Sequence, residues 1–157
     1  AVMYAYIGLS FGDLLSGILS QILKSRKIVV YLYLVFTFTL TIIFLFVLKD
    51  ISLSTYYLMC FLLGTGTGYW AIFVTIAAEQ FGTNIRSTAA NTIPNFVRGS
   101  VSLITLTFGM LVSFNLNDGI SAFIVGIVFL LIALYSISQL KETFGKDLNY
   151  LETGEII

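Results

Sequence analysis

The fold of this chain is decided by residues 79–105, which read E-Q-F-G-T-N-I-R-S-T-A-A-N-T-I-P-N-F-V-R-G-S-V-S-L-I-T. A short charged turn is followed by an apolar run that is too long for a surface helix of a soluble protein. Polar residues recur in this run at intervals of 4, 3, 4 and 3, so on a helix they share one face: Asn91, Asn95, Arg98, Ser102 and Thr105. Such a stripe has to face water or polar groups. We therefore expect this helix to form one wall of a solute pathway.

The composition of the whole chain favours a membrane protein. Of 157 residues, 58% are hydrophobic and 10% are charged, whereas roughly a quarter of the residues of a soluble domain are charged. The net charge is zero, so nucleic acid is not an expected partner. The absence of histidine and the single cysteine, Cys60, argue against a metal site, a disulfide framework or acid–base catalysis. We expect neither a cofactor nor an enzyme.

Five segments are long enough to cross a bilayer, which requires about 20 apolar residues in a helix. The predicted transmembrane bundle, residues 1–140, has spans at residues 1–23, 28–48, 55–78, 88–114 and 119–140, and residues 141–157 form a polar tail. The short connections make neighbouring helices antiparallel. Because Ala1 lies within a hydrophobic run, we expect a fragment, or a chain whose start is missing.

The positive charges predict the orientation in the plasma (inner) membrane. Of the eight lysines and arginines, Lys49 lies on one side and Arg98 lies within a span. The other six lie on the opposite side: Lys24, Arg26, Lys27, Arg86, Lys141 and Lys146. This asymmetry predicts that loops 24–27 and 79–87 and the C-terminus are cytoplasmic.

Asp13 is a carboxylate inside the first span, where it is costly unless it is paired, protonated or hydrated. It lies 11 residues before Lys24, or ~16 Å along a helix. Arg98 lies 12 residues after Arg86, so both groups are expected at a similar depth. We expect at least one of them to face a solute cavity; the alternative is a structural ion pair that locks two helices.

The third span contains G-T-G-T-G-Y-W, residues 64–70. Gly64 and Gly68 predict close helix packing; the alternative is a bend, with Tyr69 and Trp70 lining the cavity. The second and fifth spans have no polar face, so we expect both on the lipid side, with Tyr31 and Tyr33 in an interfacial aromatic belt.

Pro94 is predicted to interrupt the hydrogen-bond ladder of the fourth span, so that the helix can kink there, with Asn91 and Asn95 on either side of the break. Solute and ion sites of transporters collect at broken helices of this kind. Hydrogen bonds between helices are the alternative role of the two asparagines. Glu79 and Arg86 flank one turn and can pair, either as a solvated surface pair or as a latch that holds one conformation.

Three motifs resemble those of the C-terminal half of major facilitator superfamily transporters, nearest to the sugar and organic-acid porters. Residues 17–27, 79–91 and 141–152 are similar to the loop motif G-x-L-S-D-x-x-G-R-[RK]-[RK], to E-x-[FY]-P-T-x-[IV]-R-[GS]-T-[AG], and to the tail P-E-T-K-G-[KR]-[ST]-L-x-x-[IL]-E. The matching residues are Gly17, Ser20, Arg26 and Lys27; Glu79, Phe81, Thr83, Arg86, Ser87 and Thr88; and Glu142, Thr143, Gly145, Lys146, Leu148 and Glu152. Gln21, Lys24, Gly82, Lys141 and Phe144 depart from the patterns.

The resemblance implies an all-α transmembrane fold in which the five spans form most of one six-helix half, with an N-terminal half as partner. It also implies that the second and fifth spans lie outside a midplane site. The residues of the first and second motifs, with Gln21, would form a conformational latch: Gly17, Ser20, Gln21, Arg26, Lys27, Glu79 and Arg86.

We predict a secondary active transporter that moves a small polar or anionic solute across the lipid bilayer by alternating access. Arg98, Asn91 and Asn95 would bind the solute beside Tyr69 and Trp70. Asp13 would carry the coupling ion, a proton. The alternative is an integral membrane binding or signalling protein without transport, in which Asp13 and Arg98 form a structural ion pair.

Overall fold

The computed structural model of this chain describes residues 1–49 and 51–149, and these residues form helices joined by short connections. The elements are α1 (Val2–Leu23), α2 (Arg26–Ile42), the π-helix η1 (Ile43–Val47), α3 (Leu53–Thr67), α4 (Trp70–Glu79), α5 (Arg86–Ser113) and α6 (Asp118–Gln139). Hydroxyl and amide side chains cap several helix starts: Ser25 accepts from the Ile28 N–H, Ser52 from Thr55, and Asn117 from Gly119. Residues 150–157 of the predicted tail, including Glu152, lie outside the described residues.

Five helical segments within the described residues are long and apolar enough to cross a membrane. They are Val2–Leu23, Arg26–Val47, Leu53–Glu79, Arg86–Ser113 and Asp118–Gln139. Their order and positions agree with the five predicted spans to within a few residues. The described chain is thus an all-helical protein with five candidate membrane spans.

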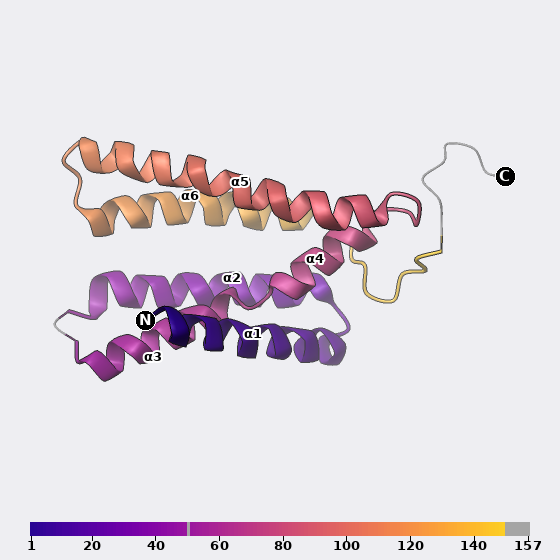
Figure 1. Cartoon of the computed structure of the whole chain (residues 1–157), viewed down its shortest axis with the longest axis horizontal. Coiled ribbons are helices and arrows are strands. Elements are labelled where there is room, and N and C mark those ends of the chain that lie inside the picture. Colours follow the sequence, from indigo (N-terminus) through magenta and orange to yellow (C-terminus); the bar gives the residue numbers. More distant parts are fainter. Residues whose placement is uncertain (50, 150–157) are drawn as a thin grey trace.

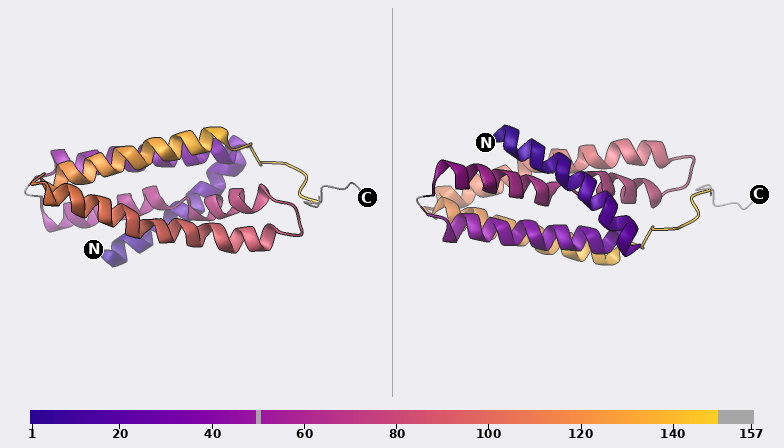
Figure 2. Two further views of the ribbon diagram at one scale, coloured as in Figure 1. Left: turned by 90° about the horizontal axis from the view of Figure 1, so that it is seen from above. Right: turned by 90° about the horizontal axis from the view of Figure 1, so that it is seen from below.

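The helices form two groups that lie alongside each other (Figure 1). One group contains α1, α2 and α3, and the other is the antiparallel pair of α5 and α6. Helix α4 runs between the groups and contacts α1, α2 and α5. Helix α1 crosses the other helices at an angle, as both views of Figure 2 show. Helix α4 therefore lies where the two groups meet.

The most extensive helix contact joins α1 to α3, and glycines make it possible. A Cβ atom at Gly68 would lie 2.5 Å from the Gly12 Cα, closer than real Cβ contacts come. A Cβ at Gly8 or Gly64 would overlap a backbone carbonyl of the opposite helix. The predicted close packing is confirmed, because the two backbones touch without side chains between them.

The interruption in the bundle lies in the third span, and α5 runs without a break through Pro94. Pro94 lies inside α5 and lacks the N–H of one ladder bond, but it does not divide α5 into two helices. The bend considered for the third span is present between α3 and α4. Gly68 ends α3 with φ −76° and ψ 46°, and Tyr69 precedes α4 with φ −115° and ψ 15°. A single proline removes one hydrogen bond, whereas glycines at three of five positions weaken helix propensity throughout the segment.

Helix α2 carries much of the core, which corrects the prediction of a plain lipid-facing helix. Val29 is fully buried and Val30 is 5% exposed, and they cluster with Tyr33, Ile72 and Ile76. Tyr33 is buried as well, and its hydroxyl donates to the Gly12 carbonyl at 2.8 Å, so it is not an interfacial aromatic. The opposite side of α2 is apolar and exposed, so periodicity within a wholly apolar segment did not distinguish the core face from the lipid face.

One end of the bundle, which we call the basic end, carries the α1–α2 turn, the α4–α5 connection and the start of the tail (Figure 1). The α2–α3 and α5–α6 connections lie at the opposite end. The predicted antiparallel order of the spans is therefore present in the structure. Six of the lysines and arginines belong to the segments at the basic end.

We expect Gly64→Val to lower the thermal stability of the chain in detergent far more than Gly126→Val. A valine at position 64 would push α1 away from α3, which should cost roughly 3 kcal/mol or more. Gly126 is a matched control in α6, because a Cβ atom at this position would have no neighbour within 4 Å. Circular dichroism melting curves measure both variants, and equal melting temperatures would contradict the close α1–α3 contact.

Candidate functional site

The candidate site is built around the first turn of α4, where the third span restarts after its interruption. The Asp13 carboxylate, from α1, accepts a hydrogen bond from the Ala71 N–H, with Oδ1 and N 3.2 Å apart. The first N–H groups of a helix have no partner within the helix and carry partial positive charge. Asp13 therefore stabilises the start of α4 by both hydrogen bonding and charge.

Arg98, from α5, approaches the same turn of α4. Its guanidinium carbon lies 5.6 Å from the centre of the Trp70 ring, a cation–π contact. Asp13 and Arg98 thus lie at a similar level in the bundle, because they contact neighbouring residues of α4. They form no ion pair in the described structure, in which the salt bridge joins Arg26 to Glu79. The structure therefore does not contain the structural Asp13–Arg98 ion pair that was considered as the alternative.

The polar stripe of α5 lies on an exposed surface of that helix. All five of its residues are exposed. The Asn91 amide donates to the Ser87 carbonyl and the Asn95 amide to the Asn91 carbonyl, each at 3.0 Å. Both asparagines therefore bond their own helix, and among the described residues their amides are not bonded to another helix. Their side-chain carbonyl oxygens accept no hydrogen bond from the described residues.

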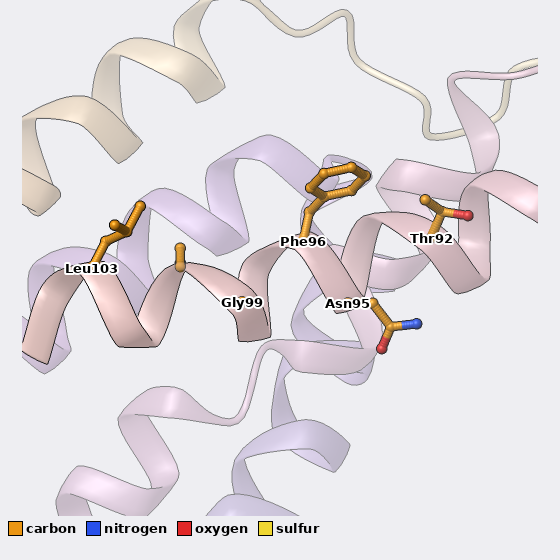
Figure 3. A pocket seen from close by; sticks show the side chains of 6 residues that line it. Thr92, Asn95, Phe96, Gly99 and Leu103 are labelled. Carbon is orange, nitrogen blue, oxygen red and sulfur yellow. The ribbon is translucent and has the colours of Figure 1, made fainter.

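A shallow hollow of about 600 Å³ runs along α5, and every residue that lines it belongs to that helix. It is lined by Thr92, Asn95, Phe96, Gly99, Ser100 and Leu103. Figure 3 shows Asn95 and Phe96 projecting from α5 in different directions. Phe96 is 76% exposed. The hollow is thus an open surface of one helix that presents both amide and aromatic groups.

The charge pair at the basic end joins Arg26 to Glu79, and not Glu79 to Arg86 as the sequence suggested. The Arg26 Nη2 and Glu79 Oε1 atoms lie 2.6 Å apart, and Glu79 is 7% exposed. Arg86 instead donates to the backbone carbonyls of Phe81, at 3.3 Å, and Leu148. The predicted pair was wrong because the folded α1–α2 turn brings a cation from 53 residues away to Glu79.

The start of the tail is tied to α2 through Glu142, a residue without a role in the sequence-based site. Its carboxylate accepts from the Ser25 hydroxyl and from the backbone N–H groups of Arg26 (3.1 Å) and Lys27 (3.3 Å). Burial tends to raise the pKa of Glu142, but hydrogen bonds from Ser25, Phe144, Arg26 and Lys27 outweigh it and lower the pKa to about 2. A serine before α2 and an acid in the tail were visible in the sequence, but not their proximity.

The remaining latch residues have separate positions at this end. The Lys27 ammonium donates to the carbonyls of Ser138 (3.3 Å) and Leu140 (2.5 Å) at the end of α6. Ser20 is 2% exposed, and its hydroxyl is unbonded within the described structure. Gly17 and Gln21 are exposed on α1. The structure therefore joins Arg26 to Glu79, and it does not gather all seven predicted residues into one network.

Tyr69 and Trp70 lie on either side of the restart of the third span and line a cavity between α2, α4, α5 and α6. The Tyr69 ring packs edge-on against Tyr33, with ring centres 6.0 Å apart. Among the described residues, no three His, Cys, Asp or Glu side chains are grouped to hold a metal ion. The groups available at the site are thus hydrogen-bonding, charged and aromatic.

Comparisons with protein families, curated proteins and solved structures found no match to this chain.

We expect the tail to detach from α2 as the pH falls from about 4.5 to about 2. The pKa of Glu142 lies below its ordinary value of 4.5 in the folded chain, so its contribution to docking is complete above pH 4.5 and is lost as the pH falls through 2. A nitroxide label at Phe144→Cys, two residues after Glu142, in a Cys60→Ser background, measures the mobility of the start of the tail. In the Glu142→Gln variant, the labelled tail should be mobile already at neutral pH. A label at Tyr135→Cys on α6 is the control for effects of pH on the rest of the bundle. A tail equally immobile at pH 7 and pH 2 would contradict this role of Glu142.

Proposed function

We propose that this chain is part of a secondary active transporter that carries a small polar or anionic solute by alternating access. The observation that supports this most strongly is the interrupted third span. At the start of α4, Asp13 of α1 accepts from a backbone N–H and Arg98 of α5 lies over the Trp70 ring. In transporters, solute and ion sites collect at discontinuous membrane helices. Ionisable residues within membrane spans usually mark such pathways.

The proposed solute group is an anion or a hydroxyl that meets Arg98. Its guanidinium has no carboxylate partner among the described ion pairs and keeps its hydrogen-bond donors available beside Trp70. The free side-chain carbonyls of Asn91 and Asn95 would accept from solute hydroxyls on the same exposed face. Charge-assisted bonds to a guanidinium are stronger than bonds between neutral groups, so Arg98 would orient the solute.

The proposed architecture is that of a major facilitator transporter half, in the plasma (inner) membrane with the basic end cytoplasmic. The three sequence motifs support this proposal, since two of them contribute Arg26 and Glu79 to an ion pair and the third contributes Glu142. The exposed face of α5 would then be covered by the N-terminal half. The solute would bind between the two surfaces.

The proposed coupling passes through α4, a helix of 10 residues. Asp13 binds its first turn, and Glu79, its last residue, pairs with Arg26. These two contacts, at Ala71 and Glu79, are ~12 Å apart along the helix. Protonation of Asp13 would remove the charge that stabilises the helix start, so proton binding and release of the Arg26–Glu79 pair would act on the same rigid element.

We expect cysteines at Asn95 and Arg98 to react with a membrane-impermeant thiosulfonate reagent in the intact protein. Water reaches a solute pathway but not hydrocarbon, and thiosulfonates react with the thiolate formed in water. Leu131→Cys on α6 is the matched control, because Leu131 is 59% exposed on a face expected to contact lipid. All three variants are made in a Cys60→Ser background and measured by mass shift. If Asn95→Cys and Arg98→Cys both label no more than the control in every transport state, the solute pathway beside α5 is excluded.

We expect Asp13→Asn to abolish accumulation driven by a proton gradient while leaving solute exchange intact. The asparagine oxygen still accepts from the Ala71 N–H, so α4 keeps its start, but the amide does not carry a transferable proton. Proteoliposomes containing the intact protein are tested with radiolabelled hexoses and dicarboxylates, with and without an imposed pH difference. Ser10→Ala, one turn before Asp13 on α1, is the control. Normal accumulation by Asp13→Asn would remove Asp13 from the coupling.

A further inference from the structure

A second cavity, of about 490 Å³, lies between α2, α4, α5 and α6. Its walls are almost entirely apolar and include Val30, Leu34, Phe73, Val97 and Ile137. This volume is within the range of small-molecule sites, but few polar groups are present to hold a sugar or an organic acid. On α5, the cavity is lined by Ile93 and Val97 and the polar stripe contains Asn95 and Arg98, so the two surfaces are separate.

The charge on the cavity wall is at the basic end, where Lys27 lines it. The Lys27 ammonium donates to two neutral carbonyl oxygens, those of Ser138 and Leu140. The ion pair of the described structure does not involve the Lys27 ammonium, and the nearby Glu142 carboxylate binds the backbone N–H of Lys27 at 3.3 Å. An ammonium has three donors, and one is available to an anionic group at the mouth of the cavity.

The length of the cavity matches one leaflet of a bilayer. Its wall on α4 extends from Trp70 to Gln80, a distance of ~15 Å at the helical rise. The hydrocarbon core of a bilayer is ~30 Å thick, so one acyl chain reaches about half of that depth. The apolar lining thus extends from headgroup level at Lys27 to the region of chain ends at Trp70.

We propose that this cavity is a binding site for an anionic phospholipid, with one acyl chain between α4 and α6 and the phosphate beside Lys27. The apolar walls fit the chain, and the Lys27 ammonium, which makes no salt bridge in the described structure, favours an anionic headgroup over a zwitterionic one. Such a lipid would fill space between the α5–α6 pair and the other helices. The site does not depend on transport, because none of its argument uses Asp13 or Arg98.

Trp70 supplies the probe for this proposal, because it is the only tryptophan of the chain and lines the cavity. The chain is reconstituted in phosphatidylcholine vesicles that contain, at equal mole fraction, either phosphatidylglycerol or phosphatidylcholine with bromine on the acyl chain. Bromine quenches tryptophan fluorescence only at short range. We expect the anionic lipid to compete for the site with about a fivefold preference and therefore to quench Trp70 more strongly at low mole fraction.

Lys27→Gln should remove this preference, while Lys24→Gln, an exposed lysine at the same end, should keep it. Ala133→Phe, which fills the cavity without changing charge, should remove the excess quenching as well. Circular dichroism monitors folding; if Lys27→Gln unfolds, Ala133→Phe decides between the outcomes. Equal quenching by the two lipids, or a preference that persists in a folded Lys27→Gln or in Ala133→Phe, would overturn the proposal.

Discussion

A membrane helix that stops and restarts leaves backbone N–H groups without partners, and hydrocarbon offers none. In this chain the third span is interrupted between α3 and α4, and the carboxylate of Asp13 binds the Ala71 N–H where the helix restarts. That bond supplies an acceptor at the start of α4, and α4 in turn carries Trp70 at its start and Glu79 at its end. The aromatic contact with Arg98 and the ion pair with Arg26 therefore both depend on the same restarted helix.

Small residues place Asp13 within reach of that N–H. Gly12 and Gly68 bring the backbones of α1 and α3 into direct contact one residue before Asp13 and three residues before Ala71. Tyr33 fixes the same point by donating to the Gly12 carbonyl. A side chain at either glycine would separate the helices and leave the α4 start without its acceptor. The polar site and the tightest packing in the bundle are therefore parts of one arrangement.

The spans and their order could be predicted from the sequence, because a candidate span is recognised by its length and hydrophobicity alone. The polar face of α5 could be predicted because its residues recur with the period of a helix. Pairing between distant segments was not predictable in the same way. Glu79 pairs with Arg26 and not with the nearer Arg86, because the pairing depends on how α1 and α2 pack against α4. The core face of α2 was missed because its two faces are equally apolar, and only packing distinguishes Val29 from Leu32. The role of Glu142 likewise requires the tail to return to the start of α2.

The charges at the two ends of α4 differ in how well they suit the helix. Asp13 places a negative charge beside the positive start of the helix, which is favourable, whereas Glu79 places one at the negative end, which is unfavourable without a cation. Arg26 supplies that cation, through one bond that leaves Oε2 of Glu79 and Nε of Arg26 unbonded in the described structure. A bidentate pair would be stronger and more rigid. The single bond therefore neutralises a buried carboxylate, while the contact stays weaker than a bidentate pair would be.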